Sequence, residues 1–245
     1  MSRPPRRPLT RFADSPRAGM DRQTIPTAAP PLFTPAPGVR VVLASASPRR
    51  RELLAGWGLP FTVLTAPADE EPRPQAGEPA HAYAARAARN KAASVHALLD
   101  ADAAQASLVI AADTVVCLGS RILGKPRDAA EALHMLEQLS GHTHTVVSAV
   151  ALRMPGTWAG PAEECLTDTA SVTFAAWPRE VLAAYARTGE PDDKAGAYAI
   201  QGRGAFLAER LEGAWSTVVG LPLAPLAALL LRRGLLLPAA RAVRY

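Results

Sequence analysis

The sequence VRVVLASASPRRRELLAGWG, residues 39–58, joins an apolar run to a cluster of arginines through a few small residues. The apolar run is short and rich in β-branched residues, which predicts a buried strand. Ser47 is a residue type that caps helices, and Pro48 suits the first helical position. Three apolar residues then share one helical face: Leu53, Leu54 and Trp57. The stretch therefore predicts a strand, a tight loop and the start of a helix.

The rest of the chain continues to alternate between strand and helix patterns. Short runs of strand-forming residues bounded by turn residues predict strands at 60–66, 107–119, 121–123, 144–152, 168–176, 204–213 and 215–222. Apolar residues at helical spacing predict helices at 79–99, 128–139, 178–187 and 222–233. Asp128 and Glu131 would form a capping box for the second of these helices. The alternation predicts the α/β class, with a mixed sheet rather than a purely parallel one.

Composition limits the kind of protein this can be. The chain has 245 residues, 49% of them hydrophobic, which is enough for one good core or for two small lobes around a cleft. No apolar run approaches the roughly 18 residues of a membrane span, so we expect no membrane segment. Cys117 and Cys165 are too few and too far apart for a disulfide framework or a zinc site. We therefore expect a protein of a reducing compartment, the cytoplasm.

The net charge of +5 is concentrated in the first 38 residues. Six arginines stand there against two aspartates, with nine of the 23 prolines and almost no apolar periodicity. This composition predicts a disordered extension over residues 1–38, an ordered domain over residues 39–237 and a short tail over residues 238–245. The extension is either a solvated segment or a basic contact for phosphate, and no specific nucleic acid is expected as a partner. It lacks the apolar core of a signal peptide, so we do not expect export.

The arginine cluster after the first strand has the composition of an anion site. Backbone N–H groups at a helix start attract negative charge, and Ser45, Ser47, Arg49 and Arg50 stand beside them. Arginine adds bidentate contacts to phosphate oxygens. The alternative is a capped surface helix whose arginines are solvated.

Asp113 interrupts the apolar run LVIAADTVVCL, where a buried strand favours another aliphatic residue. An unpaired buried carboxylate is costly, so Asp113 requires a partner, a metal ion or an exposed position at a strand end. A carboxylate that faces a cleft suits a general base or a magnesium ligand. The alternative is a local bulge or turn in which Asp113 and Thr114 bond to nearby backbone.

Three lysines stand in unusual settings. Lys91 falls on the apolar side of its helix by i, i+4 spacing, so its ammonium either extends past the core to solvent or points into a site. Lys125 follows a short strand inside the tripeptide GKP. Lys194 shares a glycine-rich loop with Tyr198 and Gln201, a set that suits a phosphate, a ring and a base edge. The glycines fit neither a dinucleotide fingerprint nor a P-loop, so a loop without a ligand is the alternative.

Taken in order along residues 42–233, these motifs resemble the Maf family of nucleoside triphosphate pyrophosphatases. The matching segments are LASASPRRRELL, ADEE, the helix lysine Lys91, AADTVV, ILGKP, MLEQLSGHTHTVVSAVAL, EPDDKAGAYAIQGRGA and VVGLPL. Any one segment would be weak evidence, whereas all of them in the family's order are specific. The resemblance implies a Maf or ITPase-like α/β fold, with a mixed twisted sheet, flanking helices and two lobes around a central cleft.

The resemblance also implies a reaction and roles for named residues. A nucleoside triphosphate would be hydrolysed between its α and β phosphates to a monophosphate and pyrophosphate. Asp113 matches the family's catalytic aspartate, which accepts a proton from the attacking water. Glu70 and Asp113 match its site for a divalent cation, Mg²⁺ or Mn²⁺. The family's cationic phosphate cluster matches Arg50, Lys91, Lys125 and Lys194, beside the predicted phosphate contacts of Ser45 and Ser47. A homodimer is compatible with the family.

Three positions indicate which base is bound. Arg49, Thr114 and Gln201 match the subgroup that acts on dTTP and UTP, modified pyrimidine triphosphates being natural extensions of that set. The 7-methyl-GTP subgroup typically has tryptophan, glutamine and glutamate at these positions. A glutamine amide can donate to O4 and accept from N3–H of a pyrimidine, which a glutamate cannot do. The alternatives are another base preference, 7-methyl-GTP among them, and a non-catalytic nucleotide-sensing or division-inhibiting protein that binds nucleotide without turnover.

Overall fold

The structure is a computed structural model that describes residues 23–25, 30–65 and 72–239. Its strands are β1 (Gln23–Ile25), β2 (Phe33–Pro35), β3 (Arg40–Ala44), β4 (Phe61–Val63), β5 (Ser107–Leu118), β6 (Arg121–Leu123), β7 (Thr143–Arg153), β8 (Glu163–Phe174), β9 (Ala208–Glu212) and β10 (Leu236–Pro238). Its α-helices are α1 (Pro48–Ala55), α2 (Ala80–His96), α3 (Ala101–Ala106), α4 (Ala129–Leu139), α5 (Arg179–Ala186), α6 (Trp215–Val219) and α7 (Leu223–Arg232). Two 3-10 segments are η1 (Ala195–Ala197) and η2 (Gly202–Leu207).

Eight of the described strands form one mixed sheet. Their order is β1-β4-β3-β5-β7-β8-β9, with β6 paired to β5. β3 runs parallel to β4 and to β5, while the other neighbours in this sheet are antiparallel. β2 and β10 form a separate two-stranded sheet. The predicted α/β class with a mixed sheet is confirmed.

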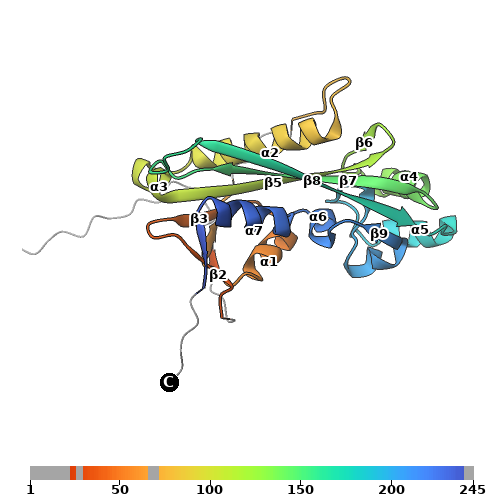
Figure 1. Ribbon diagram of the computed structural model, residues 1–245. Helices are drawn as coiled ribbons and strands as arrows, with labels where there is room; N and C mark the ends of the chain where they lie inside the picture. Colours follow the sequence, from red (N-terminus) through yellow and green to blue (C-terminus); the bar gives the residue numbers. More distant parts are fainter. Residues whose placement is uncertain (1–22, 26–29, 66–71, 240–245) are drawn as a thin grey trace, which may run out of the picture.

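Alternation along the strands divides the apolar side chains between the two faces of the sheet. In β3, Val41 and Leu43 pack with the core that includes α1 and α7, whereas Val42 and Ala44 pack against the buried alanines of α2. Figure 1 shows α2 above the sheet and α1 and α7 below it. The alanines of α2 are small, so this helix can lie close to the sheet. The first lobe is therefore a three-layer unit.

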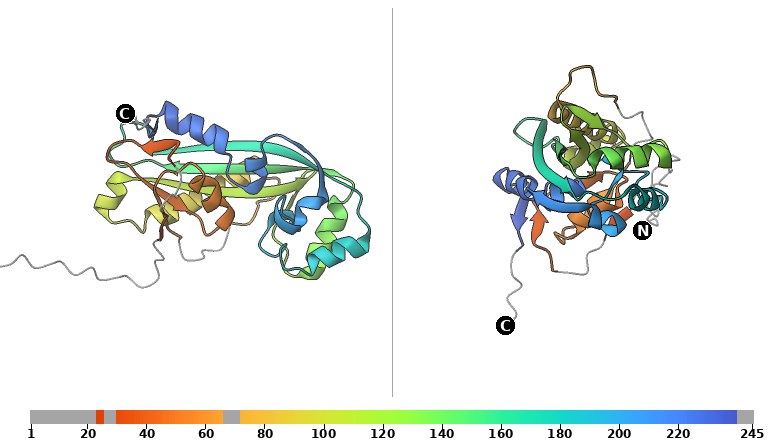
Figure 2. Two further views of the ribbon diagram at one scale, coloured as in Figure 1. Left: turned by 90° about the horizontal axis from the view of Figure 1, so that it is seen from below. Right: turned by 90° about the vertical axis from the view of Figure 1, so that its right-hand side faces the viewer.

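A third core lies at the far end of the long strands β5, β7 and β8. It joins Phe174 of β8 to Leu136 of α4, Leu182 of α5, Tyr198 and Leu207. Figure 2 shows α4 and α5 together at this end, away from α3 and α7. The long strands thus run through both lobes, and the two-lobed arrangement implied by the resemblance is present. Within the described residues, no helix is both long and apolar enough to cross a membrane.

The register of the sheet leaves one edge of β5 open near its centre. β3 pairs with β5 as far as Ala44, which lies opposite Ala111, and β6 begins to pair at Val116. Neither strand covers residues 112–115 on this edge. Their backbone groups can therefore bond to side chains from other elements. The opening also adjoins the carboxyl end of a parallel strand, where ligands of α/β proteins commonly bind.

The predicted helix starts are confirmed in most details. Ser47 caps α1 by accepting a hydrogen bond from Arg50 N, and Pro48 is the first residue of that helix. Asp128 caps α4 by accepting from Glu131 N. The Glu131 carboxylate accepts from Arg127 N at 2.7 Å rather than returning to Asp128, so the predicted capping box forms only on one side.

The prediction of a strand at residues 215–222 is wrong, because most of this segment forms helix α6. The β-branched residues that suggested a strand make tertiary contacts instead. Thr217 Oγ1 donates to Asp168 Oδ2 of β8, and Thr217 O accepts from Ser148 Oγ of β7. Gly220 ends the helix with a φ of +116°, which suits glycine. The strand predicted at residues 204–213 is similarly confined to β9, since η2 occupies residues 202–207.

The predicted disorder of residues 1–38 is wrong for the part of that segment that the structure describes. Residues 23–25 pair with β4, and residues 33–35 pair with β10. The Phe33 ring meets the Trp57 ring edge-on at a centroid distance of 5.3 Å, so it packs against an apolar core. The many prolines around Phe33 made this segment resemble a disordered one in the sequence. The tail was predicted to begin at residue 238, but Pro238 still belongs to strand β10. Residues 1–22, 26–29 and 240–245 lie outside the described residues.

Candidate active site

A cavity of about 1340 Å³ lies between the two lobes, beside the open edge of β5. All ten described residues that the sequence assigned to a site line it: Ser45, Ser47, Arg49, Arg50, Lys91, Asp113, Thr114, Lys125, Lys194 and Gln201. They come from the start of α1, from α2 and β5, from the β6–α4 connection and from the loop before η2. Glu70, the remaining predicted site residue, lies outside the described residues.

Asp113 lies in the middle of β5, opposite Ala149 of β7, and not at a strand end. Alternation points its side chain to the face covered by α2, where Lys91 Nζ donates to Asp113 Oδ1 at 2.6 Å. The sequence left three explanations for this buried carboxylate: a partner, a metal ion or an exposed position at a strand end. The structure contains the first of these, a charged partner. Asp113 is 7% exposed and lines the cavity, and Lys91 points into the cavity beside it. A carboxylate and an ammonium thus lie together at the base of the site.

The Arg50 guanidinium forms hydrogen bonds along the open edge of β5. Its Nη1 donates to Ala112 O at 2.8 Å and its Nη2 donates to Thr114 Oγ1 at 3.0 Å, so the guanidinium contacts both neighbours of Asp113. Its Nε donates to Gly220 O at 2.8 Å, at the end of α6. A phosphate role for Arg50 stays a prediction. The contacts in the structure give it a supporting role around Asp113.

The Thr114 hydroxyl is committed to the protein. Ser148 Oγ donates its one hydrogen to Thr217 O at 2.7 Å. The Thr114–Ser148 hydrogen bond of 2.8 Å must therefore use the hydrogen of Thr114, whose oxygen also accepts from Arg50. Thr114 can thus influence a ligand through the placement of Arg50, and not by donating its hydroxyl hydrogen to a base.

Ser148 and Thr217 are site-supporting residues that the sequence analysis missed. Both are fully buried. Ser148 stands directly opposite Thr114 in the β5–β7 register, inside the apolar run TVVSAVAL. A polar residue within an apolar strand is the signal that singled out Asp113, and the same signal was present here. Thr217 carried no such signal, because threonine is common in strands.

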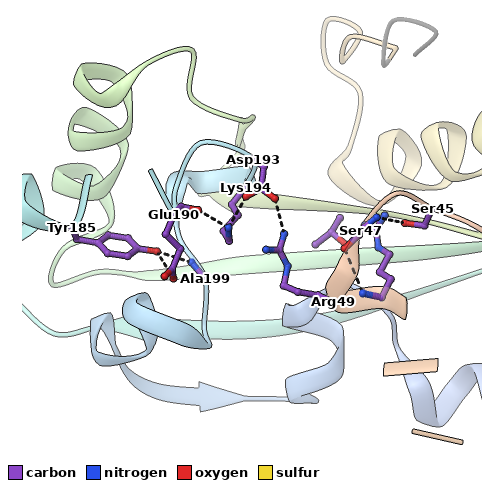
Figure 3. Close-up of polar contacts among 10 residues, drawn as sticks. Ser45, Ser47, Arg49, Tyr185, Glu190, Asp193, Lys194 and Ala199 are labelled. Carbon is purple, nitrogen blue, oxygen red and sulfur yellow. Dashed lines mark hydrogen bonds and ion pairs between the residues drawn. The ribbon is translucent and has the colours of Figure 1, made fainter. Parts of the chain in front are cut away.

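The two serines before α1 organise the turn from β3 into the helix. Ser45 Oγ accepts from Ser47 N at 3.2 Å, and Ser47 Oγ accepts from Arg50 N at 3.4 Å. Each hydroxyl accepts a backbone hydrogen and keeps its own hydrogen to donate. Both line the cavity, and Figure 3 shows them on the turn that carries Arg49. A serine pair of this kind can present O–H groups to an anion.

Charged groups from both lobes meet across the cavity (Figure 3). Arg49 Nη2 lies 3.6 Å from Asp193 Oδ2, and Asp193 Oδ1 accepts from Lys194 Nζ at 2.5 Å. Lys194 Nζ also donates to Glu190 O. An anion that binds both cations has to compete with the Asp193 carboxylate. Lys125 and Gln201 line the same cavity, from the β6–α4 connection and from the residue before η2.

One carboxylate of the cavity, that of Asp113, is of the kind that binds a divalent cation. Mg²⁺ takes oxygen ligands and is commonly held by one or two carboxylates together with substrate phosphates. Asp113 supplies a carboxylate at the cavity wall. No group of three histidine, cysteine, aspartate or glutamate side chains suited to a metal occurs in the part of the chain that the structure describes. A cation bound to Asp113 would need further oxygen ligands, which substrate phosphates can supply.

His144 and Tyr198 form a buried polar pair next to the cavity. His144 Nε2 lies 2.9 Å from Tyr198 Oη, and both rings meet Phe174 edge-on. Tyr198 itself lines the cavity. Burial lowers the pKa of His144 from 6.5 to about 4, because the charged imidazolium would lose its hydration.

We expect acid to destabilise the protein through His144. An unfolded chain takes up the proton near pH 6.5, whereas the folded chain resists it until about pH 4, so stability is lost as the pH falls between these values. The difference corresponds to about 3 kcal/mol of unfolding free energy. Urea unfolding at several pH values would measure it. The His144→Gln variant should lose this part of the pH dependence, and His134→Gln, on the exposed side of α4, should keep it. Equal slopes for wild type and His144→Gln would contradict the expectation.

Three comparisons relate this chain to known proteins. The family model described as Maf-like protein matches residues 40–233. A protein of Myxococcus xanthus named dTTP/UTP pyrophosphatase is 54% identical, over 81% of this chain and 94% of that protein. A protein of Nitratidesulfovibrio vulgaris with the same name is 50% identical, over 79% of this chain and 88% of that protein. A solved structure of a nucleoside-triphosphatase, dITP/XTP pyrophosphatase, from Mycobacterium abscessus covers 80% of this chain and 94% of its own, with 16% identity and a TM-score of 0.36. That last likeness is too low to add to the argument.

Proposed function

The chain belongs to the Maf family, and from this premise we propose that it hydrolyses dTTP and UTP to the nucleoside monophosphate and pyrophosphate. The observation that carries the proposal is the gathering of all ten described candidate residues on one cavity. Relatives about half identical to this chain are named dTTP/UTP pyrophosphatase, which supports the choice of substrate. Modified pyrimidine triphosphates would be accepted as far as their base edge allows.

The cations of the cavity would bind the triphosphate. A triphosphate carries about four negative charges, and phosphoryl transfer is accelerated mainly by cations around its oxygens and by a positioned nucleophile. Lys91 of α2, Lys125 of the β6–α4 connection and Lys194, just before η1, supply positive charge. Arg49 becomes available when a phosphate replaces the Asp193 carboxylate. The serine hydroxyls before α1 add neutral donors.

Asp113 would accept a proton from water as the water oxygen bonds to the α phosphorus. The bond between that phosphorus and the oxygen bridging to the β phosphate breaks, and pyrophosphate leaves with the electron pair. Lys91 orients the carboxylate through its bond to Oδ1, and Arg50 supports both neighbours of Asp113 through the Ala112 carbonyl and the Thr114 hydroxyl. A divalent cation, Mg²⁺ or Mn²⁺, at Asp113 and Glu70 would neutralise phosphate charge. Gln201 would read the base edge, with Arg49 nearby and Thr114 acting through Arg50.

A substrate panel tests the proposal. Pyrophosphate release is measured from dTTP, UTP, CTP, GTP and 7-methyl-GTP with Mg²⁺ or Mn²⁺, and without metal. We expect turnover of dTTP and UTP that exceeds that of the other three by at least about tenfold, since a site built for one hydrogen-bonding edge rejects a mismatched one. A preference for 7-methyl-GTP would assign another base to the same reaction. Tight nucleotide binding without pyrophosphate release would replace the enzyme by a nucleotide sensor.

We further propose that the enzyme is cytoplasmic and acts on free nucleotides. We also propose that it forms a homodimer. Cys117 and Cys165 are unpaired thiols, which agrees with a reducing compartment. Sedimentation analysis would measure the assembly, and a monomer at micromolar concentration would contradict the dimer.

A further inference from the structure

The loop that carries Gln201 is held by a carboxylate for which the proposed reaction has no direct use. Glu190 Oε1 accepts from Gly204 N at 3.1 Å, and Glu190 Oε2 accepts from Arg203 N at 3.0 Å. These two N–H groups follow Gln201 by two and three residues. Figure 3 shows the Glu190 side chain turned toward Tyr185 and Ala199, beside Lys194. The carboxylate therefore fixes the chain on the C-terminal side of Gln201.

Tyr185 completes the support on the other side of Gln201. Its hydroxyl donates to Glu190 Oε1 at 3.2 Å and accepts from Ala199 N at 3.2 Å. Tyr185 is buried, and burial raises its pKa, so the phenol keeps the hydrogen that it donates. Glu190 and Tyr185 thus bond to backbone both before and after Gln201. We call these two side chains the Glu190–Tyr185 bracket.

Two glycines allow the loop to close on this bracket. Gly202 has a φ of +73°, and a Cβ there would lie 3.2 Å from Glu190 Oε1. A Cβ on Gly204 would lie 2.4 Å from the Tyr185 hydroxyl oxygen, closer than atoms can approach. These glycines matched no phosphate-binding pattern in the sequence. Their spacing is explained by the close approach of the loop backbone to two polar side chains.

The same residue also holds a second group of the cavity. The backbone carbonyl of Glu190 accepts from Lys194 Nζ at 2.5 Å. Glu190 is therefore bonded to the lysine that we assign to phosphate and, through the loop, to the glutamine that we assign to the base. Its side chain acts on the Gln201 loop, and its backbone acts on Lys194.

We propose that Glu190 is a positioning residue for base recognition, one that sets the discrimination between uracil and cytosine by fixing the loop of Gln201. This inference rests on the proposed function. A carboxylate can accept at both oxygens, which suits three donors, whereas a glutamine side chain would turn its NH₂ group toward one or two of them, depending on its orientation. In a Glu190→Gln variant, one or two of the three bonds are lost and the loop loosens. The contact from Lys194 to the Glu190 carbonyl remains, because it involves the backbone.

The test compares UTP with CTP, in turnover and in equilibrium binding. We expect Glu190→Gln to lower the UTP-to-CTP ratio of kcat/KM about tenfold. The displaced Gln201 amide would no longer form the hydrogen bonds that favour uracil over cytosine. Inhibition by pyrophosphate, which has no base, should stay within about twofold of wild type. Neither the ratio nor the inhibition constant depends on the fraction of folded enzyme. A merely structural loss would lower activity toward both nucleotides alike.

Three further variants sharpen the result. Tyr185→Phe removes the hydroxyl of the bracket and should lower the same ratio. Asp192→Asn, an exposed neighbour on the same loop, makes the same change of carboxylate to amide and should leave the ratio unchanged. Glu190→Gln combined with Gln201→Ala should be no less selective than Gln201→Ala alone, because both changes act through one contact.

The inference and the proposed function can fail separately. If the wild type releases no pyrophosphate, the proposed hydrolysis is contradicted. The ratio of dissociation constants for UTP and CTP, in wild type and in Glu190→Gln, would still decide the role of Glu190. The inference is overturned if Glu190→Gln keeps the wild-type ratio in binding and turnover. It is also overturned if its effect adds fully to that of Gln201→Ala, or if the wild type does not distinguish the two bases.

Discussion

Replacing Asp113 by asparagine is expected to lower kcat for dTTP by about a thousandfold, within the range that a general base contributes to a proton transfer. Asparagine has almost the same shape, and its side-chain oxygen can still accept from Lys91 Nζ, so the fold should be kept. What is lost is the negative charge that takes up the proton of the attacking water and helps to hold a divalent cation. Pyrophosphate release under saturating dTTP measures the change.

The control for this experiment is Asp128→Asn. Asp128 caps α4 and is not one of the residues that line the cavity, and asparagine is also a good cap, so activity and stability should both be unchanged. Circular dichroism and dTTP binding would show that Asp113→Asn is folded and binds its substrate. If Asp113→Asn keeps more than about a third of the wild-type kcat, another group must accept the proton.

The second large effect is expected for Arg50→Lys, which keeps the charge but not the shape of the side chain. The guanidinium bonds to Ala112 O, Thr114 Oγ1 and Gly220 O at once, and one ammonium cannot reach all three. At least one of these three acceptors would lose its partner, and each such loss at a buried acceptor costs about 1–3 kcal/mol. We expect the unfolding free energy to fall by about 3 kcal/mol and kcat/KM to fall about a hundredfold. Urea unfolding and steady-state kinetics would measure the two.

This variant separates support from phosphate binding. If Arg50 served mainly as a positive charge for phosphate, lysine would preserve most of the stability and would raise KM with little change in kcat. A supporting role instead predicts a loss of both stability and kcat, because the backbone beside Asp113 shifts. Arg179→Lys is the matched control, since Arg179 is a largely exposed arginine whose ion pair with Glu137 contributes little. Its stability should change by less than about 0.5 kcal/mol.

The site residues that the sequence could reveal are those that interrupt a pattern. Asp113 breaks an apolar strand, and Lys91 breaks the apolar side of a helix, so both stood out before their contact was known. Glu190 lies in the polar run EPDD, where acidic side chains are ordinary. Its importance comes from backbone N–H groups that approach it through the fold, and those approaches follow no spacing along the chain. The supporting residues were therefore hidden while the central pair was not.

The fold shows the same division between local and long-range causes. The turn at Ser47 and Pro48 could be predicted because capping depends on neighbouring residues. Helix α6 could not, because Thr217 favours a strand locally and is held in a helix by its bonds to β7 and β8. The open edge of β5 depends on where β3 stops pairing and β6 begins, and no sequence pattern fixes that register. Strand β2 could not be predicted either, because the prolines around Phe33 are typical of a segment without regular structure.

The bond from Arg50 to Gly220 joins residues 170 positions apart, and this has a consequence for biosynthesis. A chain made as far as α5 already contains Asp113, Lys91 and Arg50, yet the Gln201 loop and the Gly220 carbonyl are still missing. Closing so long a loop is entropically costly and belongs to the late, slow part of folding. We therefore expect that a nascent chain has no hydrolytic activity until α6 has emerged.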